Sequence, residues 1–147
     1  TETVLNLFKD VDYDLKIGDF QSLPWKNNYF DLVIDISALY ANTKEVIDKT
    51  VNEVYRVLKP QGHLYTKLWG TKSEGFGLGE KISSHTFNKI NKGIFVDMGL
   101  TTFFDLENII KVFHMFDCQN IDQILRYNGI RKKILTEEFH CHFQKEK

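Results

Sequence analysis

Hydrophobic and polar residues alternate along three segments in the first half of the chain. Asp14–Asp19 alternates with a period of two and ends in Gly-Asp, which predicts a short strand that leads into a loop at 20–28. Phe30–Ile36 is a compact apolar run rich in β-branched residues, typical of a strand covered on both faces. His63–Trp69 again alternates with a period of two, so it predicts a third strand.

Between the second and third of these strands the period changes to that of a helix. Asn42 and Glu45 are spaced as in a capping box, which predicts that the helix begins at Asn42. Pro60 and Gly62 then end it. Its apolar face is predicted to consist of Ile47, Val51, Val54, Tyr55 and Leu58. Strand, helix and strand in this order form a βαβ unit, in which the two strands are parallel and the crossover is right-handed.

The second half of the chain is less regular. Residues 70–104 contain six glycines among aromatic and polar residues, so we interpret this segment as an irregular insert with a short helical piece at Thr86–Ile90. A second helix begins at Asp105, whose side chain can cap it. Its inward residues are predicted to be Leu106, Ile109, Ile110, Phe113 and Phe116. Ile121–Tyr127 and Glu138–Phe143 are predicted to form a closing antiparallel pair.

Composition and charge narrow the possible partners. The 147 residues are 42% hydrophobic, enough for one buried core. Because 19 Lys and Arg nearly balance 20 Asp and Glu, we expect neither a nucleic-acid nor a membrane partner. The two cysteines, Cys118 and Cys141, fit a reducing cytoplasmic setting. The His-Cys-His run at 140–142 alternates like a strand and would place its histidines opposite the cysteine, so we expect no metal site.

Two motifs carry a resemblance to a known family. GDFQSLPWKNNYFDLVID at 18–35 and EVYRVLKPQG at 53–62 resemble the middle of class I S-adenosylmethionine-dependent methyltransferases. The combination is specific, because strand and helix physics alone would not require Leu-Pro-Trp before a strand or Leu-Lys-Pro after a helix. The resemblance covers about 14–69 well and continues loosely to the end of the chain.

The resemblance implies an α/β fold, Rossmann-like, with three αβα layers and a mostly parallel sheet that ends in an antiparallel edge pair. In this family a glycine-rich loop after the first strand and an acidic residue after the second hold the cofactor, S-adenosylmethionine. Residues 1–10 are too few for these elements, so we expect residues 1–147 to be the C-terminal two-thirds of one methyltransferase domain that lacks its first two strands. In the family's sheet those strands lie between the third and fourth strands, so without them Asp14–Asp19 and Phe30–Ile36 would face a gap with unpaired backbone groups.

Gly75–Gly79 (GFGLG) is not a substitute for the missing loop. Polar residues 70–74 separate it from the preceding strand, whereas a phosphate-binding turn leaves its strand directly. We interpret the insert at 70–104 as a flap over the mouth of the substrate site.

The resemblance also assigns cofactor-binding residues. Asp19 would accept a hydrogen bond from the adenine amino group, and the backbone amide of Phe20 would meet the ring edge. Asp35, Ile36 and Ser37 would face the sulfonium and amino end of the cofactor, where a carboxylate suits a cation. Asp19 could instead be a turn residue, and Asp35 could cap the turn that follows it.

Residues near the methyl acceptor are open to two interpretations. Tyr40 stands where family members often carry His or another polar residue near the acceptor, or it is a core aromatic. Trp69 and Phe76 are candidate walls of the acceptor pocket, or simply core packing. His85 is the only histidine of the insert, and a surface position is the simpler interpretation. If the acceptor must lose a proton, Asp35, Tyr40 or His85 could serve as the base.

The predicted activity is transfer of a methyl group from S-adenosylmethionine to an unidentified acceptor, expected to be a small molecule. This in-line displacement needs alignment and exclusion of water rather than a nucleophilic residue. The alternative is a non-catalytic, methyltransferase-like fragment that binds a partner through the exposed sheet. Glu53 and Arg56, three residues apart on the helix, are predicted to form a local ion pair.

Overall fold

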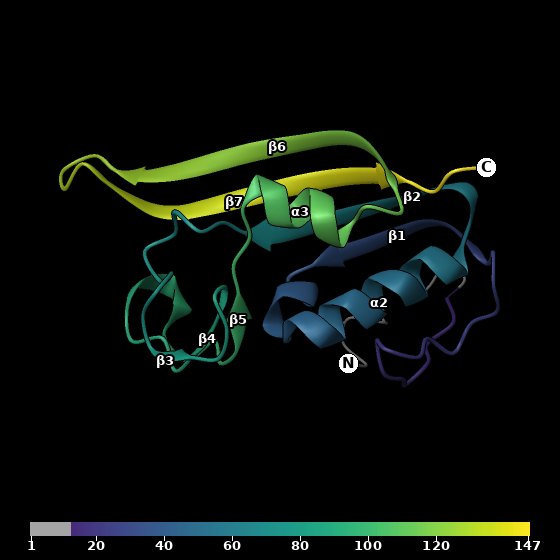
Figure 1. Cartoon of the computed structure of the whole chain (residues 1–147), viewed down its shortest axis with the longest axis horizontal. Helices are drawn as coiled ribbons and strands as arrows, with labels where there is room; N and C mark the ends of the chain where they lie inside the picture. Colours follow the sequence, from purple (N-terminus) through teal and green to yellow (C-terminus); the bar gives the residue numbers. More distant parts are fainter. Residues whose placement is uncertain (1–12) are drawn as a thin grey trace.

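The computed structural model describes residues 13–147, which form a four-stranded mixed sheet with helices packed against it (Figure 1). The strands are β1 (Phe30–Ile36), β2 (Leu58–Trp69), β6 (Asp117–Asn128) and β7 (Lys133–Gln144), in the order β1-β2-β7-β6. β1 is parallel to β2, while β2–β7 and β7–β6 are antiparallel. The predicted α/β fold, its parallel pair and its antiparallel closing edge are confirmed. The expectation for residues 1–10 lies outside the described residues.

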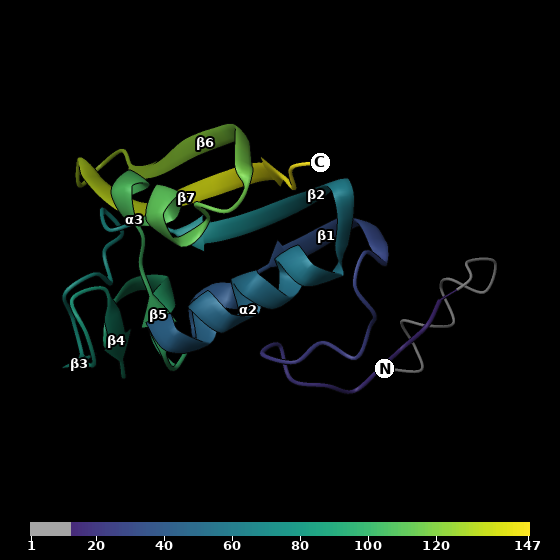
Figure 2. The same cartoon turned by 45° about the vertical axis from the view of Figure 1, so that its right-hand side comes forward.

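Two α-helices cover one face of the sheet. α2 (Lys44–Val57) crosses from β1 to β2, and α3 (Leu106–Val112) precedes β6 (Figure 2). Their apolar sides meet strand residues in one core that includes Ile47, Val51, Ile109, Leu64 and Phe143. On the opposite face Ile34 and Tyr65 sit side by side in register. Ile34, Ile36 and Tyr65 are 60%, 69% and 47% exposed, so this face is open among the described residues.

The insert at 70–104 contains its own small antiparallel sheet. Its strands are β3 (Glu80–Lys81), β4 (Thr86–Asn88) and β5 (Thr101–Thr102), and a 3-10 turn, η3 (Gly93–Phe95), lies between the last two. The predicted helical piece at Thr86–Ile90 is therefore wrong. A helix of five residues is marginal by itself, and the buried hydroxyls of Thr86 and Thr102 hydrogen-bond across the sheet at 2.7 Å instead.

The predicted strand at Asp14–Asp19 is also wrong. Residues 13–18 adopt no regular structure, Ile17 is fully exposed, and Asp19 makes only an isolated bridge with Ser22. A strand requires a neighbour for its backbone hydrogen bonds, and none of the described strands lies beside this segment. Alternating polarity alone therefore does not establish a strand in this segment.

The boundaries of α2 differ from the prediction at both ends. Thr43, not Asn42, is the N-cap residue. The Asn42 amide donates to the carbonyl oxygens of Ala38 and Leu39 at 3.0 and 3.3 Å, so it closes the preceding 3-10 turn η2 (Leu39–Ala41) instead. At the other end, Leu58 already pairs with β1, and the register between β1 and β2 shifts between Leu58 and His63, the stretch that contains Pro60.

The second helix confirms its predicted cap but only part of its inward face. The Asp105 carboxylate accepts a hydrogen bond from the Asn108 amide at 2.8 Å. Ile109 is buried, as are Phe113 and Phe116 beyond the helix end. Leu106 and Ile110, predicted to be inward, are 50% and 53% exposed, because this seven-residue helix turns only a narrow stripe toward the core.

Candidate functional site

The carboxyl end of β1 is organised by Asp35. One of its carboxylate oxygens accepts hydrogen bonds from the amides of Ala38 and Leu39, both at 3.1 Å. The other accepts from the hydroxyl of Thr66, its register partner on β2, at 2.7 Å. The alternative interpretation of Asp35, a cap for the turn that follows it, therefore describes its contacts, and cofactor binding stays a prediction.

The backbone turns sharply just after Asp35. Ser37 has a φ of 78°, a left-handed conformation that costs a residue with a side chain about 1–2 kcal/mol. The hydrogen bonds from Ala38 and Leu39 to Asp35 span this position and hold the turn. Because strained backbone of this kind clusters at ligand sites, the turn marks the end of β1 as a candidate site.

A groove of about 470 Å³ runs along the open edge of β1. Asp35 and Ile36 line it from the strand, and Phe20 lines it from the preceding loop. Asp19 and Ser37 are not among its lining residues. The Asp19 carboxylate accepts a hydrogen bond from the Gln21 amide at 2.8 Å, so it shapes the turn beside Phe20. Three of the five predicted cofactor-binding residues thus share one groove.

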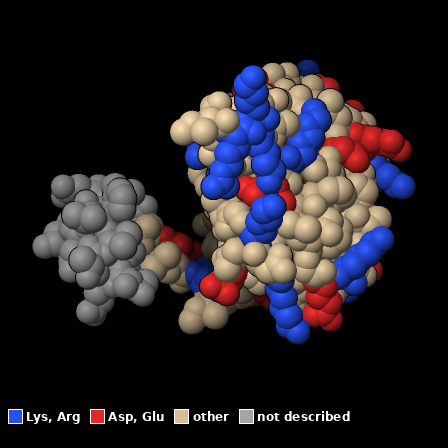
Figure 3. Space-filling view, turned by 90° about the vertical axis from the view of Figure 1, so that its left-hand side faces the viewer, with Lys and Arg blue, Asp and Glu red and all other residues tan. Residues whose placement is uncertain are grey.

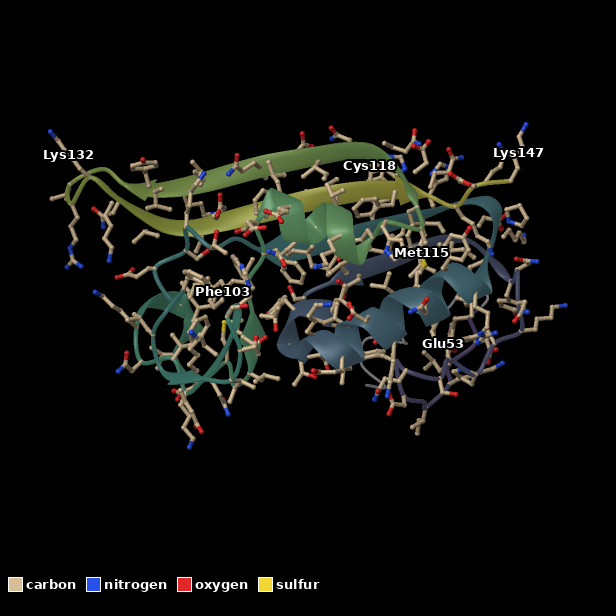
Figure 4. The ribbon with its side chains drawn as sticks, in the orientation of Figure 1. Glu53, Phe103, Met115, Cys118, Lys132 and Lys147 are labelled. Carbon is tan, nitrogen blue, oxygen red and sulfur yellow. The ribbon has the colours of Figure 1, made fainter. Side chains whose placement is uncertain are left out.

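An ion pair on α2 holds the loop that forms one wall of this groove, and Figure 4 labels its acidic member, Glu53. Arg56 and Glu53 are 2.8 Å apart, which confirms the predicted pair. Arg56 also donates to the carbonyl oxygens of Leu23 and Trp25 at 3.0 and 2.8 Å, and Glu53 accepts from the Leu23 amide at 2.8 Å. The hydrogen bond from Arg56 lowers the pKa of Glu53 despite partial burial.

Sequence reasoning missed this second role of the pair. Leu23 and Trp25 both line the groove, so the pair positions part of the candidate site. The Leu-Pro-Trp and Arg-Val-Leu-Lys-Pro motifs were the available signal, because one supplies the carbonyl groups and the other the guanidinium.

Tyr40 and Trp69 lie together at the carboxyl ends of β1 and β2. Their rings meet edge to face with centroids 5.9 Å apart, and each residue is only 6% exposed. Lys67 places its ammonium 4.6 Å from the centre of the Trp69 ring. The indole N–H of Trp69 is buried and has no hydrogen-bond partner among residues 13–147. The structure therefore brings these two predicted acceptor-site residues into contact.

Phe76 and His85 belong to a different part of the molecule. Phe76 packs edge to face on Phe87 and Phe103 within the insert, with centroids 5.4 and 5.6 Å apart. His85 lines a separate pocket of about 230 Å³ that shares no lining residue with the groove. Its Nε2 lies 3.3 Å from the Asp105 carboxylate. The structure does not bring either residue together with Asp35.

Figure 3 shows basic and acidic side chains on one face of the molecule. At the end formed by the insert and the β6–β7 hairpin, basic side chains lie among acidic ones (Figure 3), and Lys133 contacts Glu74 at 2.7 Å. Within residues 13–147 no group of three or more His, Cys, Asp or Glu is arranged to hold a metal ion. Cys141 lies in the core, where burial raises its pKa to about 12. No helix among the described residues is long and apolar enough to cross a membrane.

Comparison with known proteins agrees with this geometry. Residues 2–66 match a family model described as a methyltransferase domain. A S-adenosylmethionine-dependent methyltransferase from Methanosarcina mazei has a similar structure, with a TM-score of 0.67 and 17% identity over 89% of this chain and 66% of that one. None of the curated proteins matches the chain in sequence.

Two further solved structures share the fold. The 1,6-didemethyltoxoflavin-N1-methyltransferase of Burkholderia thailandensis, solved with 1,6-didemethyltoxoflavin and S-adenosylhomocysteine, has a TM-score of 0.59 and 11% identity over 87% of this chain and 48% of that one. The [4+2]-cyclase SpnF has a TM-score of 0.64 and 16% identity over 98% of this chain and 60% of that one. This chain thus spans between about half and two thirds of the length of these three structures.

The mixed sheet with its crossover helix has the Rossmann-like α/β fold that the solved structures share, and a groove lies at the carboxyl end of β1. The sequence match is more specific but covers less of the chain. Residues 2–66, fewer than half of the 147, are similar to a methyltransferase domain, and the solved methyltransferase structures share the fold.

Proposed function

We propose that this protein transfers a methyl group from S-adenosylmethionine to a small-molecule acceptor. The observation that carries the proposal is the groove along β1, which joins Phe20 to Asp35 and Ile36 in a chain whose residues 2–66 are similar to a methyltransferase domain. Ligands of open α/β sheets bind outside the carboxyl ends of parallel strands, and this groove reaches that end of β1. When bound, the cofactor would supply the methyl group on a sulfonium centre.

The contacts of each residue suggest its role. We assign Asp19 and the Phe20 backbone to the adenine end, as the family resemblance implies. Asp35 already accepts three hydrogen bonds, so we assign it a positioning role rather than that of a base. It holds the Ile36–Ser37 turn and keeps a negative charge beside the proposed place of the sulfonium.

We place the acceptor near Tyr40 and Trp69. These two aromatic residues are in contact, belong to the buried core and line neither the groove nor the pocket of His85, so we assign them the role of positioning the end of β1 beside the acceptor. If the acceptor must lose a proton, Tyr40 and His85 are the remaining candidates for the base; Tyr40 is 6% exposed, and His85 lines a pocket separate from the groove. The Burkholderia thailandensis neighbour, solved with a small acceptor molecule, supports this class of substrate.

We further propose that the described residues supply one side of the cofactor site and that other elements of the domain complete it. The outer edge of β1 is unpaired among residues 13–147, and its Leu32 and Ile34 are 44% and 60% exposed. A strand in this state normally pairs with another. The solved structures that share the fold are also longer than this chain.

Calorimetric titration with S-adenosylmethionine tests the proposal. The 147-residue chain should bind about 10³-fold more weakly than a protein that also carries the glycine-rich loop, because two or three charge-assisted hydrogen bonds are lost. In the longer protein, Asp19→Asn should weaken binding, whereas Asp117→Asn on the exposed end of β6 should not. Micromolar binding by the short chain would refute the proposed division of the site, and no binding by the longer protein would refute the function.

A second function, binding of a partner without catalysis, is favoured by one observation. The open face of the sheet carries Ile34, Ile36 and Tyr65 in exposed positions. A fold does not by itself imply an activity, and the cyclase SpnF shares this one. Transfer of a labelled methyl group from the cofactor to any small molecule would decide for the enzyme.

A further inference from the structure

A pair of histidines lies on the open face of the sheet, away from the groove. His63 on β2 and His142 on β7 point at one another, with His63 Nδ1 and His142 Nε2 only 2.9 Å apart. The register pairs Tyr65 with His142 and His63 with Gln144, so the two histidines are diagonal neighbours on the same face. They are 79 residues apart in sequence, and only the pairing of β2 with β7 brings them together.

We propose that His63 and His142 bind a divalent transition metal ion of the kind that prefers imidazole nitrogen, such as Ni²⁺ or Cu²⁺. Two nitrogens each about 2.0–2.1 Å from one ion and at a right angle to one another lie about 2.9 Å apart. This spacing suits neighbouring positions of a square-planar or octahedral site, the geometries that these ions favour. The ion would lie to one side of the line that joins the two nitrogens, and the proton on the donating nitrogen would move to the other nitrogen of its ring.

The surroundings favour neutral, well-oriented rings, as metal binding requires. The Tyr65 ring stacks on His142 with centroids 4.3 Å apart and planes 11° apart, which fixes that imidazole. Burial lowers the pKa of His142, and the neighbouring His63 adds to this effect. Both rings are half-buried, so solvent reaches the pair.

The pair supplies two ligands and leaves the remaining positions to water or to another molecule. Residues 13–147 hold no cluster of three or more suitable side chains, so the site is open. It differs from the His-Cys-His run at 140–142, because Cys141 faces the core and His140 pairs with Glu138 at 3.2 Å.

Calorimetric titration of the untagged 147-residue chain with NiCl₂ at pH 7.5 tests the proposal. We expect one Ni²⁺ per chain and no heat with MgCl₂, since Mg²⁺ prefers oxygen ligands. His63→Gln and His142→Gln should each weaken Ni²⁺ binding by about tenfold or more. A tenfold change corresponds to about 1.4 kcal/mol of binding free energy. His140→Gln, on the same strand, is the matched control and should bind like the original chain.

Thermal melts with and without Ni²⁺ keep the test valid if a variant is less stable. A ligand that binds only the folded state raises the melting temperature. Ni²⁺ should raise it for the original chain and for His140→Gln, but not for His63→Gln or His142→Gln. Unchanged binding by either of these two variants, or absence of Ni²⁺ binding by the original chain, would overturn the proposal.

Discussion

The Thr66 hydroxyl donates a 2.7 Å hydrogen bond to the carboxylate of Asp35, which ties the carboxyl end of β1 to β2. Thr66 is only 3% exposed. The same carboxylate holds the turn after β1 through the amides of Ala38 and Leu39. One side chain therefore sets both the strand pairing and the backbone of the candidate cofactor site.

Replacement of Asp35 should lower stability as well as cofactor binding. Asp35→Ala removes the cap of the turn, which typically costs about 1–2 kcal/mol, and leaves the buried Thr66 hydroxyl without its acceptor. Asp35→Asn keeps one oxygen acceptor and should lose less. Urea denaturation of both variants measures the difference, with the exposed Asp117→Asn as control. Equal stability of Asp35→Ala and the original chain would contradict the positioning role.

Loss of the Glu53–Arg56 ion pair on α2 should loosen the loop that lines the groove. Arg56→Ala removes hydrogen bonds to Leu23 and Trp25 and leaves Glu53 without its cation, so we expect a loss of about 2 kcal/mol. Tryptophan fluorescence should also report greater exposure of Trp25. Arg131→Ala, in the β6–β7 turn, removes an exposed arginine of the same type and should change neither quantity. Unaltered fluorescence and stability in Arg56→Ala would show that the loop is held by other contacts.

The elements that sequence predicts well are those whose signal is local. The apolar face of α2 and the runs at Phe30–Ile36 and His63–Trp69 carry their period within a few residues, and all three formed. The strand at Asp14–Asp19 has the same alternation but depends on a neighbour that is not among the described strands. The prediction for Thr86–Ile90 is wrong because the structure of this segment depends on pairing with β5, in which the paired residues are 14 and 16 positions apart in the sequence.

The candidate site also combines features that the sequence predicts with contacts that it does not. Asp35 could be placed because it ends a strand, and Tyr40 and Trp69 follow from the parallel pairing of β1 and β2. Contacts between distant segments could not be predicted, such as Arg56 with the carbonyl groups of the Leu-Pro-Trp loop or His63 with His142. The motif resemblance identified both partners of the first contact without showing that they touch.

Gly70 should not tolerate a side chain. A methyl group there would overlap the side chain of Glu137, which is 1% exposed and accepts a 2.7 Å hydrogen bond from the Lys72 amide. Since Glu137 has no room to move, Gly70→Ala should cost about 1–3 kcal/mol. Gly129→Ala is the matched control, because nothing lies within 4 Å of its added methyl group, and it should stay within about 0.5 kcal/mol of the original chain. Urea denaturation of the two variants compares them directly.

Stability should fall with decreasing pH because of His142. Burial lowers its pKa in the folded state, and the facing His63 lowers it further. In the folded chain His142 therefore stays unprotonated at pH values near 6.5, where it binds a proton in the unfolded chain. Above that value both states are neutral and stability is full. As the pH falls through 6.5 toward the lowered folded pKa, the unfolded state binds more protons and the free energy of unfolding decreases.

The pH range over which His142 affects stability differs from that of Glu138, a buried carboxylate on the same strand. The pKa of Glu138 is lowered, since hydrogen bonds from His140 and Lys67 outweigh its burial, so its contribution to stability is lost only below about pH 4.5. Urea denaturation of the original chain and of His142→Gln between pH 7.5 and pH 5 therefore isolates the histidine. The variant should show a shallower fall of unfolding free energy over this range. An identical slope in both proteins would mean that His142 titrates alike in the folded and unfolded states.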